Sequence, residues 1–103
     1  MRVFLVCSGG MSSGMLAQSL MAEALKQGNT DFKIEAGNVE AIADKLAANG
    51  CDIILVAPQV GYKKANIEEQ AAPHNVPVMV IEGRFYTPMG APKLYPEIMA
   101  KVK

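Results

Sequence analysis

The apolar positions of the chain alternate between short continuous runs and longer stretches in which they recur at helical spacing. Near-continuous apolar runs at residues 2–6, 52–57 and 76–82 are typical of strands buried on both faces of a parallel sheet. Residues 32–36 alternate between apolar and polar side chains, as expected of an edge strand. Helical spacing fills the segments between and after these runs, so the predicted order of elements is β-α-β-α-β-α-β-α.

Each predicted helix has recognisable limits. The first spans residues 12–27 and ends at Gly28; its predicted core stripe comprises Met15, Leu16, Leu20, Met21, Ala24 and Leu25. The second helix begins after Asn38, a residue type that favours the N-cap, and ends at Gly50. A weaker third helix must stop by Pro73. The last helix has Pro92 or Pro96 in its first turn.

This pattern predicts the α/β class, with an open four-stranded parallel sheet, helices on both faces and one domain over residues 1–103. Ligands of such sheets bind beyond the carboxyl ends of the strands. The segments after the strands, namely 7–14, 37–38, 58–62 and 83–90, are therefore predicted at the functional edge. Cys51 and His74 precede strands and are predicted at the opposite edge, where Cys51 serves packing and His74 a surface or loop role.

Composition excludes several classes of function. The 103 residues include 10 Lys and Arg against 10 Asp and Glu, so the chain lacks the basic excess of a nucleic-acid binder or a polybasic membrane-surface protein. No apolar stretch approaches the roughly 20 residues that span a bilayer, and no signal peptide is recognised, so a cytoplasmic location is expected. Two Cys and one His give no zinc spacing, and neither a metal nor a cofactor is expected.

The most informative segment follows the first strand. It begins with Cys7 and continues with Ser8, Gly9, Gly10, Met11, Ser12, Ser13 and Gly14. Backbone N–H groups of a Gly-rich loop and of a helix start form a cradle for anions, and the same field favours a thiolate. The segment is therefore predicted to be a phosphate-binding loop, with Cys7 as its nucleophile.

Known phosphate loops fit this segment incompletely. Met15 and Leu16 occupy the positions of the Lys and Ser/Thr of a Walker A motif, which argues against Mg-nucleotide binding. A cysteine phosphatase would carry Arg at position 13, where this chain has Ser13, and no Asp follows a strand as a general acid. Such a loop would hold a cysteinyl phosphate without activating water. A low-molecular-weight cysteine phosphatase remains one alternative. An FMN-binding flavodoxin-like module is the other, and it is less favoured because the chain has few aromatic residues to stack on the flavin ring.

Three motifs in order carry a resemblance to a known family. They are Cys-Ser-Gly-Gly-Met-Ser-Ser at 7–13, Ala-Pro-Gln-Val-Gly-Tyr at 57–62 and Glu-Gly-Arg-Phe-Tyr at 82–86. With them the chain resembles, over nearly its whole length, the IIB component of the lactose/cellobiose (chitobiose-like) class of the bacterial sugar phosphotransferase system (PTS). The resemblance implies that Cys7 is the phosphorylated nucleophile, that residues 8–14 enclose its phosphate, and that Gln59, Tyr62 and Tyr86 are supporting residues.

The resemblance also implies partners. Members of the family accept a phosphoryl group from a phosphohistidine of the IIA component and transfer it to a sugar bound by the membrane component IIC. For this chain the implied sugar is a β-linked disaccharide such as cellobiose, chitobiose or lactose, and the isolated protein is expected to be monomeric. Apart from the resemblance, Lys63, Lys64 and Arg84 are expected to be ordinary solvated charges, and the alternative is that their positions after strands let them attract an anionic partner site.

Overall fold

Four parallel strands form the centre of the computed structural model, which describes residues 1–7, 11–48, 50–86 and 88–102. The strands are β1 (Arg2–Val6), β2 (Lys33–Gly37), β3 (Ile53–Val56) and β4 (Val78–Val80), in the order β2-β1-β3-β4. All three pairings are parallel. The predicted open parallel sheet is confirmed, and the order places β1 between β2 and β3.

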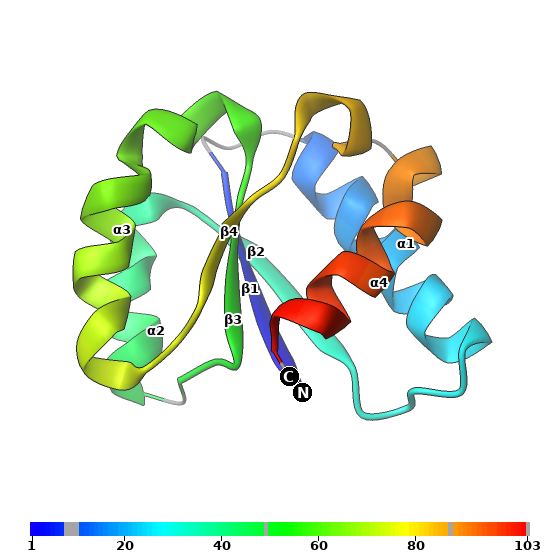
Figure 1. Cartoon of the computed structure of the whole chain (residues 1–103), viewed down its shortest axis with the longest axis horizontal. Helices are drawn as coiled ribbons and strands as arrows, with labels where there is room; N and C mark the ends of the chain where they lie inside the picture. Colours follow the sequence, from blue (N-terminus) through cyan, green and yellow to red (C-terminus); the bar gives the residue numbers. More distant parts are fainter. Residues whose placement is uncertain (8–10, 49, 87, 103) are drawn as a thin grey trace.

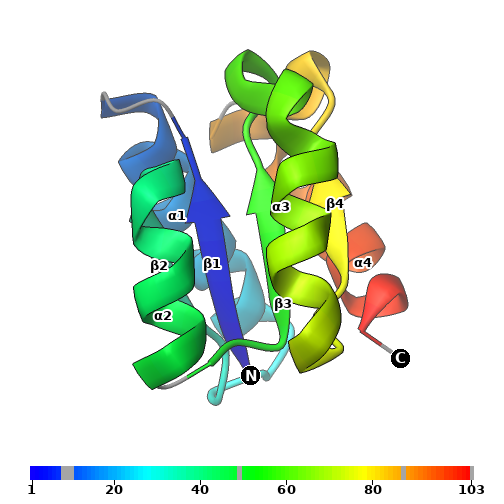
Figure 2. The ribbon, with the colours of Figure 1, turned by 90° about the vertical axis from the view of Figure 1, so that its left-hand side faces the viewer.

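Helices cover both faces of this sheet, as predicted. Helices α1 (Met11–Lys26) and α4 (Ala91–Lys101) lie on one face, and α2 (Ile42–Ala48) and α3 (Lys64–Ala71) lie on the other (Figures 1 and 2). Short 3₁₀ turns complete the connections: η1 (Val39–Ala41), η2 (Pro58–Lys63), η3 (Ala72–His74), η4 (Gly83–Phe85) and η5 (Pro88–Gly90).

The continuous apolar runs are explained by two separate cores. Val3 and Leu5 of β1 pack in the core beneath α1 and α4, whereas Phe4 and Val6 pack in the core beneath α2 and α3. All four are at most 2% exposed. Successive side chains of a strand point to opposite faces, so a strand covered on both faces needs an apolar residue at every position.

Two predictions about burial were wrong. The run at 76–82 forms only the three-residue strand β4, which lies at the edge of the sheet, pairs with β3 alone and is half-buried at Met79 and Val80. In α1, Met15 and Leu25 are 51% and 61% exposed. At 3.6 residues per turn both lie about 140° around the helix from the fully buried Leu20, so they fall outside its core face.

The predicted helix starts are largely confirmed. Asn38 is the N-cap residue of η1, which precedes α2, although its side chain makes no capping hydrogen bond. Pro92 rather than Pro96 lies in the first turn of α4, and Pro96 lies inside that helix. In the described part of the chain, no helix has the length and apolar character needed to cross a membrane.

Candidate functional site

Cys7 lies directly after β1, at the carboxyl edge of the sheet. Its backbone N–H donates a hydrogen bond of 2.9 Å to the carbonyl oxygen of Gly37, and its Sγ lies 3.5 Å from the same oxygen. The residue is only 5% exposed. The last residue of β2 therefore fixes the position of Cys7. Because β1 lies between β2 and β3, Cys7 is at the position where the chain order of the strands reverses.

Gly37 itself is closely packed. A Cβ atom at this position would lie 2.8 Å from Cζ of Phe4, a buried ring in the core beneath α2 and α3. Such a separation is shorter than a normal carbon–carbon contact. Glycine is therefore the residue that lets β2 bring its terminal carbonyl to Cys7.

A pocket of about 350 Å³ opens beside Cys7. Its described lining residues come from the segments that follow three adjacent strands: Cys7 after β1, Asn38, Val39 and Glu40 after β2, and Val60, Tyr62 and Lys63 after β3. Parallel sheets place their ligand sites at this edge, where the strand order reverses. The pocket is therefore the candidate functional site.

The predicted loop adjoins this pocket along the chain. Ser8, Gly9 and Gly10 lie outside the described residues. Met11, Ser12 and Ser13 open α1, and their side chains also lie outside the description. Because α1 begins four residues after Cys7, its N-terminus, which carries a partial positive charge, lies at the same edge of the sheet (Figure 2).

Gly14 is the fourth residue of α1 and is exposed. A Cβ atom added to it would meet nothing within 4 Å. We therefore expect Gly14→Ala to raise the free energy of unfolding by about 0.5–1 kcal/mol, because alanine loses less backbone entropy in a helix. Urea unfolding of both proteins measures this change; a loss of stability would contradict the open surroundings of Gly14.

The three predicted supporting residues occupy different surroundings. Tyr62 lines the pocket with Cys7 and is 79% exposed. Gln59 is exposed and is absent from the described lining of the pocket. Tyr86 is half-buried and packs against both cores. It follows β4, which is two strands from β1 and hence roughly 10 Å away across the sheet.

Sequence reasoning named none of three pocket residues, Asn38, Glu40 and Lys63, as a site residue, although it placed Asn38 at this edge. Lys63 was expected, like Lys64 and Arg84, to be an ordinary solvated charge, with attraction of an anionic partner site as the alternative. The structure separates them: Lys64 pairs with Glu68 and Arg84 with Glu82 on the surface, whereas Lys63 is half-buried and lines the pocket. Each missed residue follows a strand by one to seven positions, which was the available signal.

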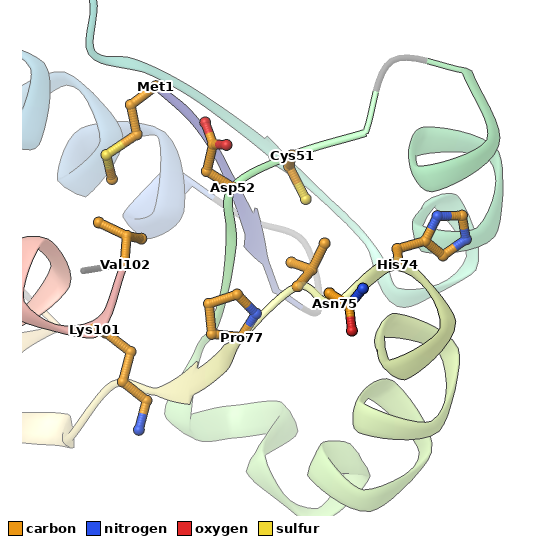
Figure 3. Close-up of a pocket in the computed structure, with 9 residues that line it drawn as sticks. Met1, Cys51, Asp52, His74, Asn75, Pro77, Lys101 and Val102 are labelled. Carbon is orange, nitrogen blue, oxygen red and sulfur yellow. The ribbon is translucent and has the colours of Figure 1, made fainter.

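A larger cavity, of about 600 Å³, lies at the opposite edge of the sheet. Cys51 and His74 line it, as expected for residues that precede strands, and their side chains lie apart from that of Lys101 (Figure 3). No group of three or more His, Cys, Asp or Glu that could hold a metal occurs among the residues described. The candidate functional site stays the pocket beside Cys7, because it lies at the carboxyl edge of the sheet.

Cys51 has the properties of a packing residue. Its side chain is partly buried against the core beneath α2 and α3, and neither Cys51 nor Cys7 forms a disulfide. Burial raises the pKa of the Cys51 thiol, the Asp52 carboxylate raises it further, and Lys45 partly opposes this shift. The thiol form is therefore favoured at neutral pH, which makes Cys51 a poor nucleophile.

This raised pKa predicts how Cys51 is alkylated. In a Cys7→Ser background, the iodoacetamide reaction of Cys51 should reach its half-maximal rate at a higher pH than that of an unperturbed thiol. Asp52→Asn should lower this pH because it removes the negative charge, while its amide oxygen can still accept the 2.7 Å hydrogen bond from the Arg2 N–H. An unchanged or higher midpoint in Asp52→Asn would contradict the electrostatic explanation.

Comparison with known proteins identifies the family. Residues 2–96 match the family described as PTS system, Lactose/Cellobiose specific IIB subunit. The chain belongs to this family. This IIB assignment selects among the three classes that the sequence left open, in favour of a phosphotransferase-system component over a phosphatase or an FMN-binding module.

Individual members of the IIB family align over almost the whole chain. The PTS system galactose-specific EIIB component of Lactococcus lactis subsp. cremoris is 30% identical over 95 residues, covering 89% of this chain and 87% of its own. A cellobiose-specific IIB component from Borrelia burgdorferi is 29% identical, with a TM-score of 0.74, over 99% of this chain and 91% of that structure. The lactose-specific IIB domain from Streptococcus pneumoniae shares the fold, with a TM-score of 0.85 at 19% identity over 100% and 98% of the two chains.

Proposed function

We propose that this IIB protein is a cytoplasmic phosphoryl carrier in which Cys7 accepts a phosphoryl group from a phosphohistidine of IIA and transfers it to a sugar bound by the membrane component IIC. The single observation that carries this proposal is the position of Cys7. Its thiol lies at the end of the central strand β1, beside a pocket and at the edge where α1 begins. Helix N-termini and Gly-rich loops stabilise both thiolates and phosphate groups.

The transfer consists of two displacements at phosphorus. In the first, the Cys7 thiolate forms an S–P bond while the N–P bond of the donor phosphohistidine breaks, and the imidazole keeps the electron pair. In the second, a sugar hydroxyl forms an O–P bond and loses its proton to solvent, while the S–P bond breaks and regenerates the thiolate. Positioning and electrostatic stabilisation supply most of the catalysis in such reactions, so residues 8–14 act mainly through backbone N–H groups.

The sugar of this system is proposed to be a β-linked disaccharide such as cellobiose, chitobiose or lactose. Cellobiose- and lactose-specific IIB proteins are among the similar structures. Residues 1–103 act as one domain that is monomeric when isolated and meets IIA and IIC in turn. Tyr62 supports the site from the pocket wall, while Gln59 and Tyr86 act from its surroundings.

The fate of the phosphoryl group tests this function against hydrolysis. Phosphorylated protein is isolated and divided between buffer alone and membranes containing IIC with cellobiose, chitobiose or lactose. A carrier keeps its phosphoryl group in buffer and loses it to one of the sugars as a sugar phosphate. Rapid release of inorganic phosphate in buffer, together with turnover of an aryl phosphate that is lost in Cys7→Ala, would instead indicate a phosphatase.

A further inference from the structure

Two opposite charges line the pocket beside Cys7. Lys63 lies at the end of η2, after β3, and Glu40 lies in η1, after β2. Because β2 and β3 are the two neighbours of β1, these residues come from segments on opposite sides of β1. They are the only charged residues in the described lining of this pocket.

Neither charge is neutralised by an ion pair with a described residue. The side-chain ion pairs among the described residues join Lys45 to Glu35, Lys64 to Glu68 and Arg84 to Glu82, and none of them includes Lys63 or Glu40. Lys63 instead places its ammonium 5.8 Å from the centre of the Tyr62 ring. A cation over an aromatic face is held in place but keeps its charge, so Lys63 remains able to attract an anion in the pocket.

Phosphorylation changes the electrostatics of this pocket strongly. A phosphoryl group on a side chain carries a charge of about −1.5 to −2 at neutral pH. Placed on Cys7, this charge would be attracted by Lys63 and repelled by Glu40. The attraction by Lys63 exceeds that at an open surface because Cys7 is buried and Lys63 is half-buried, which reduces screening by solvent. Glu40 is exposed, so its repulsion is more strongly screened.

We propose that Lys63 and Glu40 set, in opposite directions, how strongly the pocket retains a phosphoryl group on Cys7. Lys63 is then a phosphate-binding residue of the pocket, and Glu40 is a counter-charge that keeps the bound group transferable. This inference rests on the proposed function. Opposing effects of Lys63 and Glu40 keep phosphoryl retention at an intermediate strength. This suits a carrier, which must accept a phosphoryl group from one protein and release it to another molecule.

The test is the equilibrium of phosphoryl exchange between phosphorylated IIA and this protein. It is measured as the labelled fraction of each protein, at concentrations low enough that their complex is scarce. This equilibrium constant depends on how well each protein holds the phosphoryl group and not on how fast the two dock. Lys63→Met should lower it by about 3–10-fold, and Glu40→Gln, at an exposed position, should raise it by a smaller factor of about 2–3.

Two further variants make the test specific. Lys63→Arg should restore most of the retention because it restores the charge. Lys64→Met is the matched control: it removes the adjacent lysine, whose partner is Glu68 on the surface of α3, and it should leave the equilibrium constant unchanged. The effects of Lys63→Met and Glu40→Gln should both shrink as the ionic strength is raised.

The outcomes separate this inference from the function on which it rests. Equilibrium constants for Lys63→Met and Glu40→Gln that equal the wild-type value would overturn the inference, while labelling of the wild type would still support the carrier function. Equal losses of rate in Lys63→Met and Lys64→Met without a change at equilibrium would assign Lys63 to docking and also overturn it. If active phospho-IIA does not label the wild-type protein, the proposed carrier function itself is wrong.

Discussion

Cys7→Ser is expected to abolish phosphoryl acceptance from IIA while leaving the fold intact. Serine has nearly the same size and can retain the backbone hydrogen bond to Gly37, so the end of β1 should be unchanged. Its hydroxyl, however, is not ionised near neutral pH and is a far weaker nucleophile than a thiolate. The labelled fraction should fall below detection in intact-protein mass spectrometry, with an unchanged thermal unfolding midpoint.

Cys51→Ser is the matched control for this experiment. Cys51 is the other cysteine of the chain and lies at the opposite edge of the sheet, where burial raises the pKa of its thiol. The Cys51→Ser protein should therefore be phosphorylated as fully as the wild type. Normal labelling of Cys7→Ser, or loss of labelling in Cys51→Ser, would reject Cys7 as the acceptor.

Gly90→Ala is expected to cause the largest loss of stability among the glycine substitutions considered. Gly90 is buried, and a Cβ atom there would lie 2.5 Å from the carbonyl oxygen and 2.8 Å from Cα of Phe85. These are backbone atoms, so the contact cannot be relieved by rotating a side chain. The start of α4 or the turn η4 would have to move, at a cost of about 2–3 kcal/mol.

For a domain of this size, a loss of this magnitude corresponds to a decrease in Tm of about 8–20 °C. Gly83→Ala is the control within the same loop, because Gly83 is exposed and its Cβ would meet nothing within 4 Å. Its effect should stay within about 0.5 kcal/mol. Equal Tm values for Gly90→Ala and the wild type, measured by calorimetry, would show that η4 and α4 do not pack as described.

The local pattern of the sequence was sufficient to predict the type and order of the main elements. Continuous apolar runs identified β1 and β3, because both strands are covered on both faces. The same reasoning failed at β4, whose run resembles that of a buried strand although its position at the sheet edge leaves it half-exposed. Alternation correctly indicated that the strand near residues 32–36, β2, lies at the other edge. The run that contains β4 shows no such alternation, so its edge position followed only from strand pairing.

Strand order also explains what sequence reasoning missed at the site. All segments after the strands were predicted at one edge, but their distances from Cys7 depend on the order β2-β1-β3-β4. This order brings Glu40 and Lys63 to the pocket from the two neighbours of β1, whereas Tyr86 follows β4, which does not adjoin β1, and is absent from the described lining. The place of Cys7 at this edge was predictable because the residue directly follows the first apolar run. Its role as the phosphoryl acceptor stays a prediction.

The most direct test of the central claim is to locate the phosphoryl group. The wild-type protein is incubated with phosphoenolpyruvate, the general phosphotransferase proteins and its IIA partner, and is then digested and analysed by tandem mass spectrometry under conditions that preserve S–P bonds. The account predicts one phosphoryl group, attached to the peptide that contains Cys7 and carried by its sulfur. A phosphoryl group on any other residue, or an unmodified protein in the presence of fully phosphorylated IIA, would contradict it.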